Sequence, residues 1–186
     1  VELDGLIYVI GGKNDDGALS RVEVYDPVAD SWSNASDLPS SLYDISAVAI
    51  NERVYVFGGN TGSGDEAFTY EYNPGSDAWA TMADMNGDRS ATAAAVYNNK
   101  AYVFGGNGPN TKVEEYDPSN NNWSDKEAMP IARAGASAVT LGDQIYVAAG
   151  SGNSGELNIL KKYNPTDNTW SGALDNLASS VSNAAI

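Results

Sequence analysis

The sequence predicts an all-β fold made of four similar antiparallel sheets, because three markers recur in the same order four times along its 186 residues. The first marker is an apolar run that ends in two small residues, usually Gly-Gly. The second is Tyr-[Asp/Asn]-Pro, and the third is a Trp seven residues after that Tyr. The glycine pairs step by 47, 47 and 44 residues, which divides the chain into repeats of approximately 1–47, 48–94, 95–138 and 139–186.

Each marker has a structural reason. A glycine pair at the end of a strand suits a backbone with positive φ or a close approach of two backbones. Asp or Asn opens a turn, Pro presets φ, and the chain then returns with Trp on the last strand. We expect the Tyr and Trp rings to pack between neighbouring sheets rather than to bind sugar. In the fourth repeat Ala149 replaces the first glycine of the pair. The structural signature comprises Gly11, Gly12, Tyr25, Trp32, Gly58, Gly59, Tyr72, Trp79, Gly105, Gly106, Tyr116, Trp123, Gly150, Tyr163 and Trp170.

Four strands are expected in each repeat. In the second repeat they are 46–50, 53–57, 67–72 and 78–82, with a tight turn at 51–52 between the first two. A single four-stranded sheet with two apolar faces cannot bury both of them, so successive sheets must stack face to face. A period in the forties with four strands is typical of the blades of a β-propeller. The sequence therefore predicts one β-propeller domain over 1–186.

An apolar strand ending in Gly-Gly, followed by Tyr-Asp-Pro and Trp at this spacing, resembles the kelch repeat, and the resemblance covers nearly the whole chain. It implies a propeller whose innermost strands line a central channel. It also implies a ligand face built from the loops between second and third strands and from the loops between blades. Kelch propellers usually have more than four blades, so the number of repeats here is a departure from the family.

The two ends of the chain bear on how such a ring would close. Residues 1–8 align with 48–55, so the chain starts part-way along an innermost strand, and residues 182–186 align with 46–50. We expect this C-terminal strand to complete the first blade, which would remove open sheet edges. The same ends would result if the four repeats belonged to a larger propeller, so a monomer and a homodimer through exposed blade faces both remain open.

Composition excludes several classes of function. Lys and Arg number 10 against 25 Asp and Glu, a formal charge of −15, which disfavours nucleic acid and anionic membranes as partners. Cys and His are absent, which excludes disulfides, thiolate or imidazole metal sites and His-based triads. We therefore expect no metal and no cofactor. No apolar run reaches the roughly 18 to 20 residues that span a bilayer, and a chain without Cys suits either an oxidising or a reducing compartment.

The candidate ligand face comprises loops at 13–20, 60–66, 107–111 and 151–156 together with three inter-blade turns. Arg89 and Arg133 each lie thirteen residues before the Tyr of the next strand, where the resemblance implies a ligand-gripping arginine. Two arginines there would suit a carboxylate-bearing ligand or peptide, and pairing with surface acids is the alternative. The candidate ligand-face residues are Arg89, Arg133, Tyr43, Asn60, Asn107, Asp15 and Asp65.

These features favour a non-catalytic protein or peptide interaction module, since the sequence offers no nucleophile with a base beside it. The alternative is a carbohydrate-binding or sugar-isomerising protein, because kelch propellers also occur in galactose oxidase and in a mutarotase of sialic acid. The copper oxidase version is excluded, because its centre needs His ligands and a Cys cross-linked to Tyr. A third interpretation is an inactive fragment of a larger propeller.

Overall fold

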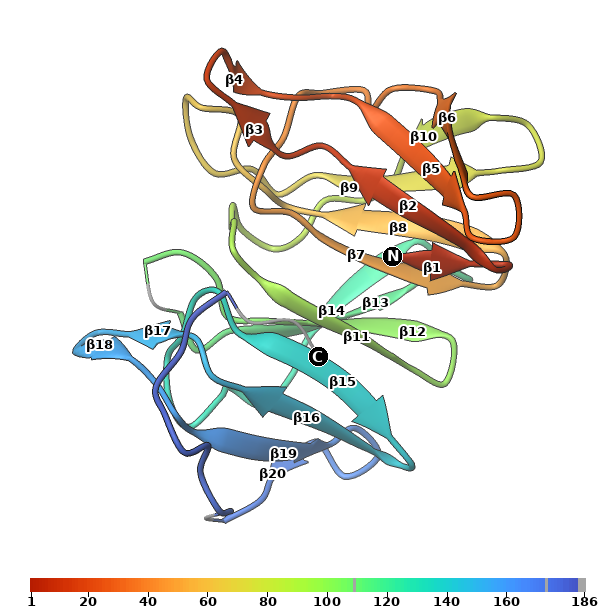
Figure 1. The fold of residues 1–186 in the computed structure, drawn as a ribbon. Coiled ribbons are helices and arrows are strands. Elements are labelled where there is room, and N and C mark those ends of the chain that lie inside the picture. The colour runs from red at the N-terminus through yellow and green to blue at the C-terminus, as the bar shows by residue number, and fades with distance from the viewer. Residues whose placement is uncertain (109, 173, 184–186) are drawn as a thin grey trace. The chain divides into compact units, whose positions relative to one another are not determined.

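The computed structural model describes residues 1–108, 110–172 and 174–183, and every regular element in them is a β-strand. The strands gather into two compact units, Val1–Ser90 and Ala91–Ile186 (Figure 1). Each unit holds two four-stranded antiparallel sheets, which we call blades, and one short hairpin. The all-β fold of repeated four-stranded sheets that the sequence predicts is therefore confirmed.

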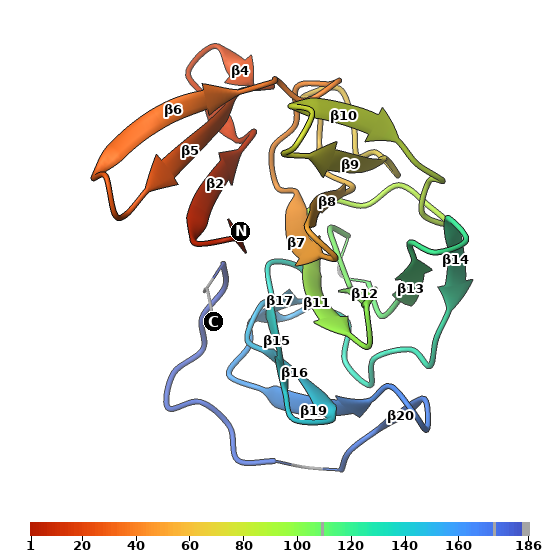
Figure 2. The same cartoon turned by 90° about the vertical axis from the view of Figure 1, so that its right-hand side faces the viewer.

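Unit 1 contains the first two blades. Its core is formed by apolar side chains of both blades, including Leu3, Val22, Val54 and Val56. The first blade has the order β1 (Glu2–Leu3), β2 (Leu6–Ile10), β5 (Val22–Asp26) and β6 (Ser31–Ala35). The second blade has the order β7 (Ser46–Ile50), β8 (Arg53–Phe57), β9 (Thr69–Asn73) and β10 (Ala78–Thr81) (Figure 2). The hairpin is formed by β3 (Lys13–Asn14) and β4 (Gly17–Ala18).

Unit 2 contains the third and fourth blades around a second apolar core, in which Phe104, Val113, Ile145 and Tyr163 are buried. The third blade has the order β11 (Ala93–Tyr97), β12 (Lys100–Phe104), β13 (Val113–Asp117) and β14 (Asn122–Asp125). The fourth blade has the order β15 (Ser137–Leu141), β16 (Gln144–Ala148), β19 (Leu160–Asn164) and β20 (Thr169–Trp170). The hairpin is formed by β17 (Ser151–Gly152) and β18 (Gly155–Glu156).

The strand bounds expected for the second repeat agree closely with the second blade. β7 and β8 match, β9 starts two residues later and ends one residue later, at Thr69 and Asn73, and β10 ends one residue earlier at Thr81. The innermost strand of the first blade, β1, has only two residues. Of the C-terminal strand expected at 182–186, Ser182 and Asn183 form no strand, and 184–186 lie outside the described residues.

The hairpin that contains Tyr-[Asp/Asn]-Pro and Trp has the same geometry in all four blades. Tyr and Trp stand directly opposite each other, as in the pairs Tyr25–Trp32 and Tyr163–Trp170, with ring centroids 5.0 Å apart in every blade. The Tyr hydroxyl donates to an Asp or Asn five residues later, which has positive φ, a conformation these residues tolerate well. These hydrogen bonds join Tyr25 to Asp30, Tyr72 to Asp77, Tyr116 to Asn121 and Tyr163 to Asn168, at 2.6, 2.7, 2.9 and 2.7 Å.

Within each unit this hairpin also binds the preceding blade. In unit 1 the Trp79 indole N–H donates to the carbonyl of Ser36 at 2.8 Å, and Asp77 Oδ1 accepts the Ser36 amide at 2.8 Å. In unit 2 the Trp170 indole N–H donates to the carbonyl of Glu127 at 2.9 Å, and Asn168 Oδ1 accepts the Glu127 amide at 2.7 Å. One peptide residue of the preceding blade is thus held through both of its backbone polar groups.

The first blade carries the same hairpin, but its Trp32 is 58% exposed. In the part of the chain that the structure describes, the Trp32 indole donates no hydrogen bond. We expect Trp79→Phe, which keeps the ring on Tyr72 but removes the donor, to lower the free energy of unfolding by about 1 kcal/mol more than Trp32→Phe. Urea unfolding of both variants measures this difference. Equal losses would contradict the assignment of the Trp79 indole to inter-blade binding.

Candidate functional site

The glycine pair fixes the loops on which the candidate site is built. The amide of the second residue of each pair donates to a carbonyl of the segment that leaves the same blade. Both residues of the pair have positive φ, for example 60° at Gly58 and 106° at Gly59. A Cβ on Gly58 would lie 2.1 Å from the carbonyl oxygen of Arg89, so only glycine fits there. The four amide-to-carbonyl contacts are Gly12 to Leu42, Gly59 to Arg89, Gly106 to Arg133 and Gly150 to Val181, at 2.8, 2.9, 3.0 and 2.9 Å.

The fourth blade shows how far this contact tolerates variation. Ala149 replaces the first glycine and keeps a φ of 61°, which an alanine rarely adopts. The next residue, Gly150, still donates to the carbonyl of Val181. The feature common to all four blades is therefore the backbone hydrogen bond of the second residue, and only the fourth blade has a methyl group at the first position.

In unit 1 three of the predicted ligand-face residues lie together beside these contacts, joined by bonds of their own. Tyr43 and Asn60 form a backbone bridge, with Asn60 N donating to Tyr43 O at 2.8 Å and Tyr43 N donating to Asn60 O at 3.1 Å. The Asn60 side-chain amide donates to Asp65 Oδ1 at 2.7 Å. The ammonium of Lys13 lies 4.6 Å from the centroid of the Tyr43 ring, a cation–π distance. Lys13, Tyr43, Asn60 and Asp65 are called the Tyr43 cluster below.

The cluster is both ordered and accessible. Asn60 Oδ1 accepts the amide of Gly62 at 2.7 Å, which makes an Asx turn and fixes the loop that carries Asp65. Tyr43, Asn60 and Asp65 are half-buried, and Lys13 is exposed. Among the described residues no donor binds Oδ2 of Asp65, so this oxygen is available to a ligand N–H. The cluster thus presents an aromatic ring, a cation and a carboxylate oxygen.

Sequence reasoning did not single out Lys13, although a signal for it exists. Lys13 directly follows the glycine pair of the first repeat, as Asn60 and Asn107 follow the pairs of the second and third. Two of these three equivalent positions were among the predicted ligand-face residues. Inspection of the position after the pair in every repeat would have added Lys13.

The two predicted arginines are buried, with 2% exposure at Arg89 and 1% at Arg133. Arg133 Nη1 donates to the carbonyls of Ala149 and Ile159 at 3.0 and 3.1 Å. Burial lowers the pKa of the Arg133 guanidinium, which still binds these oxygens as a cation. The side chain of Arg133 therefore ties the end of the third blade to the fourth, while Arg89 Nη2 lies 3.5 Å from Met85 Sδ. A ligand-gripping role for either arginine stays a prediction.

The remaining two candidates are solvated loop residues. Asp15 is exposed at the turn between β3 and β4. Asn107 is exposed too, and its Oδ1 accepts the amide of Gly108 at 3.0 Å, so it shapes its own turn. Within unit 1 Asp15 has no described contact with the Tyr43 cluster, and Asn107 belongs to unit 2.

An electrostatic network lies in the third blade, where the Glu115 carboxylate is nearly buried. Tyr102 donates to Glu115 Oε2 at 2.5 Å, and Lys100 and Lys126 lie 3.0 and 3.1 Å from its two oxygens. Burial by itself would raise the pKa of Glu115, but the hydrogen bonds from Tyr102, Lys100 and Lys126 together outweigh it and lower that pKa. Every oxygen of this carboxylate is engaged, which indicates a structural rather than a ligand-binding role.

Two further features are absent from residues 1–108, 110–172 and 174–183. This part of the chain has no group of three or more Asp or Glu arranged to hold a metal ion. It also has no helix long and apolar enough to cross a bilayer.

Each blade has four antiparallel strands, one glycine contact and one Tyr–Trp hairpin. Repeated blades of this kind are typical of β-propellers. The chain matches the family model of the KLHDC2/KLHL20/DRC7 Kelch-repeats domain over residues 1–172, and it therefore belongs to the kelch-repeat family. This finding confirms the resemblance seen in the sequence.

Two relatives place the chain further. Kelch-like protein 36 of Bos taurus is 44% identical over 41 residues, which cover 22% of this chain and 7% of that protein. The solved structure of YjhT matches with a TM-score of 0.80 at 20% identity, covering 96% of this chain and 64% of that one. At this identity the match shows the propeller fold alone. The chain spans less than two thirds of the length of either relative.

The glycine contact predicts a difference between two otherwise similar variants. A Cβ on Gly59 would lie 2.5 Å from Ile45 Cγ2 and 3.1 Å from the Tyr43 carbonyl, whereas a Cβ on Gly12 meets nothing within 4 Å. Both residues have positive φ, so Gly12→Ala serves as the control for backbone strain alone. We expect Gly59→Ala to cost about 1 to 3 kcal/mol more than Gly12→Ala in urea unfolding. Similar losses in both variants would show that the crowding at Gly59 is not important.

The Glu115 network predicts a pH dependence of stability. Because the folded-state pKa of Glu115 is below its ordinary value of 4.5, its stabilising contribution is present above that value and is lost as the pH falls below it. We expect Glu115→Gln to be less stable than the parent chain at pH near 7, with the gap narrowing under acid. Thermal melts across this range measure it. Asp143→Asn, at an exposed turn, is the control, and a constant gap for Glu115→Gln would contradict the assignment.

Proposed function

We propose that the chain is a non-catalytic interaction module that binds a protein or peptide through the Tyr43 cluster of unit 1. The kelch fold supports an interaction role in general. The single observation that carries the finer proposal is the backbone bridge between Tyr43 and Asn60, which holds loops from two blades together. A site on loops held by a rigid scaffold is where binding residues are most often found.

The chemistry of the cluster suits a peptide. Tyr43 offers a large amphipathic ring with few rotamers to fix, the kind of residue that is enriched at the centre of protein interfaces. Asp65 Oδ2 can accept a backbone or side-chain N–H of the partner, and Lys13 can bind a carbonyl or carboxylate oxygen. Because Asn60 already binds Asp65 Oδ1 and the Gly62 amide, these groups are preorganised, which lowers the entropy lost on binding.

An acidic sugar is the second candidate ligand. One observation favours it, namely that the Lys13 ammonium lies beside an accessible aromatic residue in the cluster and could pair with a sugar carboxylate. The version of this function that relies on Arg89 and Arg133 has less support, because both side chains are buried and Arg133 binds backbone carbonyls.

Selection from a phage-displayed random peptide library on the immobilised chain tests the proposal. We expect enriched peptides whose Kd rises at least about tenfold, or about 1.4 kcal/mol, with Tyr43→Ala and with Asp65→Asn. Asp143→Asn in unit 2 removes the same charge and should leave the Kd unchanged. Circular dichroism should show the parent fold in all three variants.

Two results would overturn the assignment to the Tyr43 cluster. Peptides that bind Tyr43→Ala and Asp65→Asn as tightly as the parent would place the binding face elsewhere. If no peptide is enriched, and N-acetylneuraminic acid shifts the amide signals of Tyr43 and Asn60 in a saturable way, the ligand is a sugar and the peptide proposal fails.

A further inference from the structure

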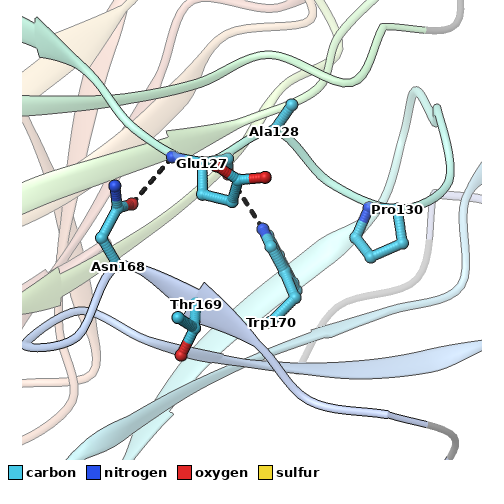
Figure 3. A pocket seen from close by; sticks show the side chains of 6 residues that line it. All are labelled: Glu127, Ala128, Pro130, Asn168, Thr169 and Trp170. Atoms are coloured by element: carbon cyan, nitrogen blue, oxygen red, sulfur yellow. Dashed lines mark hydrogen bonds between the residues drawn. The ribbon is translucent and has the colours of Figure 1, made fainter.

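A pocket of about 490 Å³ lies in unit 2 and shares no residue with the Tyr43 cluster. It lies between the third and fourth blades and is lined by Glu127, Ala128, Pro130, Asn168, Thr169 and Trp170 (Figure 3). This volume is within the range of pockets that hold small ligands or side chains. The walls combine an indole, a proline ring and one carboxylate.

The inter-blade hydrogen bonds make the walls of this pocket rigid. Trp170 is fixed through its indole N–H to the carbonyl of Glu127, and Asn168 Oδ1 accepts both the Tyr163 hydroxyl and the Glu127 amide. Figure 3 shows the two bonds to Glu127 on one side of the pocket, with Pro130 across from them. The indole is half-buried, so part of its surface remains accessible.

The Glu127 carboxylate has no partner within the described residues. Its backbone amide and carbonyl are both used, but its side chain is exposed and takes part in no ion pair or hydrogen bond there. The neighbouring Lys126 pairs instead with Glu115. The negative charge of Glu127 acts on Tyr163 of the Tyr–Trp hairpin in the fourth blade. Burial first, and then the charges of Glu115 and Glu127, raise the pKa of the Tyr163 hydroxyl.

We infer that this pocket is a binding site for an arginine side chain of a partner polypeptide. A guanidinium can stack on the Trp170 indole and pair with the Glu127 carboxylate in a planar, two-point contact, which lysine cannot do. The overall charge of −15 also draws a cationic partner to the chain. The site is independent of the Tyr43 cluster and goes beyond the function proposed above.

Unit 1 supplies an internal comparison. The Trp79 indole donates to the carbonyl of Ser36, and Asp77 accepts the Ser36 amide. Ser36 is therefore held by the same pair of hydrogen bonds that holds Glu127 in unit 2. Pro39 follows Ser36 at the same spacing as Pro130 follows Glu127. The Trp79 hairpin therefore has no counterpart of the Glu127 carboxylate, and its Asp77 carboxylate stands in the place of the Asn168 amide.

The test is an NMR titration of the folded chain with the probe acetyl-Gly-Arg-Gly-amide, followed at the Trp170 indole N–H signal, which Trp170→Phe identifies. We expect a saturable shift with a Kd on the order of 1 mM. The isosteric citrulline peptide should shift this signal at least about fivefold less at the same concentration. Added salt should weaken the arginine response, because the pairing is partly exposed.

Variants separate this site from general attraction to an acidic chain. Glu127→Gln should raise the Kd at least about fivefold, whereas Asp143→Asn, which removes the same charge in the same unit, should leave it unchanged. Ser36→Glu should make the Trp79 indole signal respond to the arginine peptide. The inference is overturned if citrulline binds equally well, if Glu127→Gln and Asp143→Asn behave alike, or if the Trp170 signal does not saturate.

Discussion

One backbone hydrogen bond, from the second residue of each glycine pair to the carbonyl of the segment leaving the same blade, is the contact on which the rest of the structure depends. It requires positive φ and a close approach of two backbones, which is why the sequence places glycine there. The bond joins the loop between the second and third strands to the loop between blades. In unit 1 the Gly12 bond ends at Leu42, next to Tyr43, and the Gly59 amide lies next to Asn60, while a separate backbone bridge joins Tyr43 to Asn60.

A second device acts at the opposite, outer end of the blades. The Tyr–Trp hairpin folds on itself through the Tyr hydroxyl and an Asp or Asn with positive φ, and it then holds one residue of the preceding blade. The Tyr hydroxyl, the Trp indole N–H and the Asp or Asn side chain of the hairpin are all used in these hydrogen bonds, so the sequences of the loops can vary. Binding chemistry can therefore change in the loops, as Lys13 and Asn60 show, or at the held residue, as Ser36 and Glu127 show, without loss of these hydrogen bonds.

Much of the fold could be predicted because the repeat places the same residues at the same structural positions four times. The sequence predicted the blades, the strand bounds of the second blade to within two residues, and three residues that lie in the Tyr43 cluster. It could not predict that the Arg133 guanidinium binds the carbonyls of Ala149 and Ile159, because that contact depends on how the third and fourth blades pack. The Asp or Asn five residues after each Tyr could have been found, because it recurs in all four repeats of the sequence. Its role as the acceptor of the Tyr hydroxyl was not predicted.

Residue-level amide exchange, followed by NMR in the intact chain, tests the central contact most directly. If the four bonds hold the loops, the amides of Gly12, Gly59, Gly106 and Gly150 will exchange as slowly as those of the central strands β8 and β12. Exchange as fast as that of the exposed Asp15 amide would show that the loops open freely, and it would contradict the central role assigned to the glycine bond.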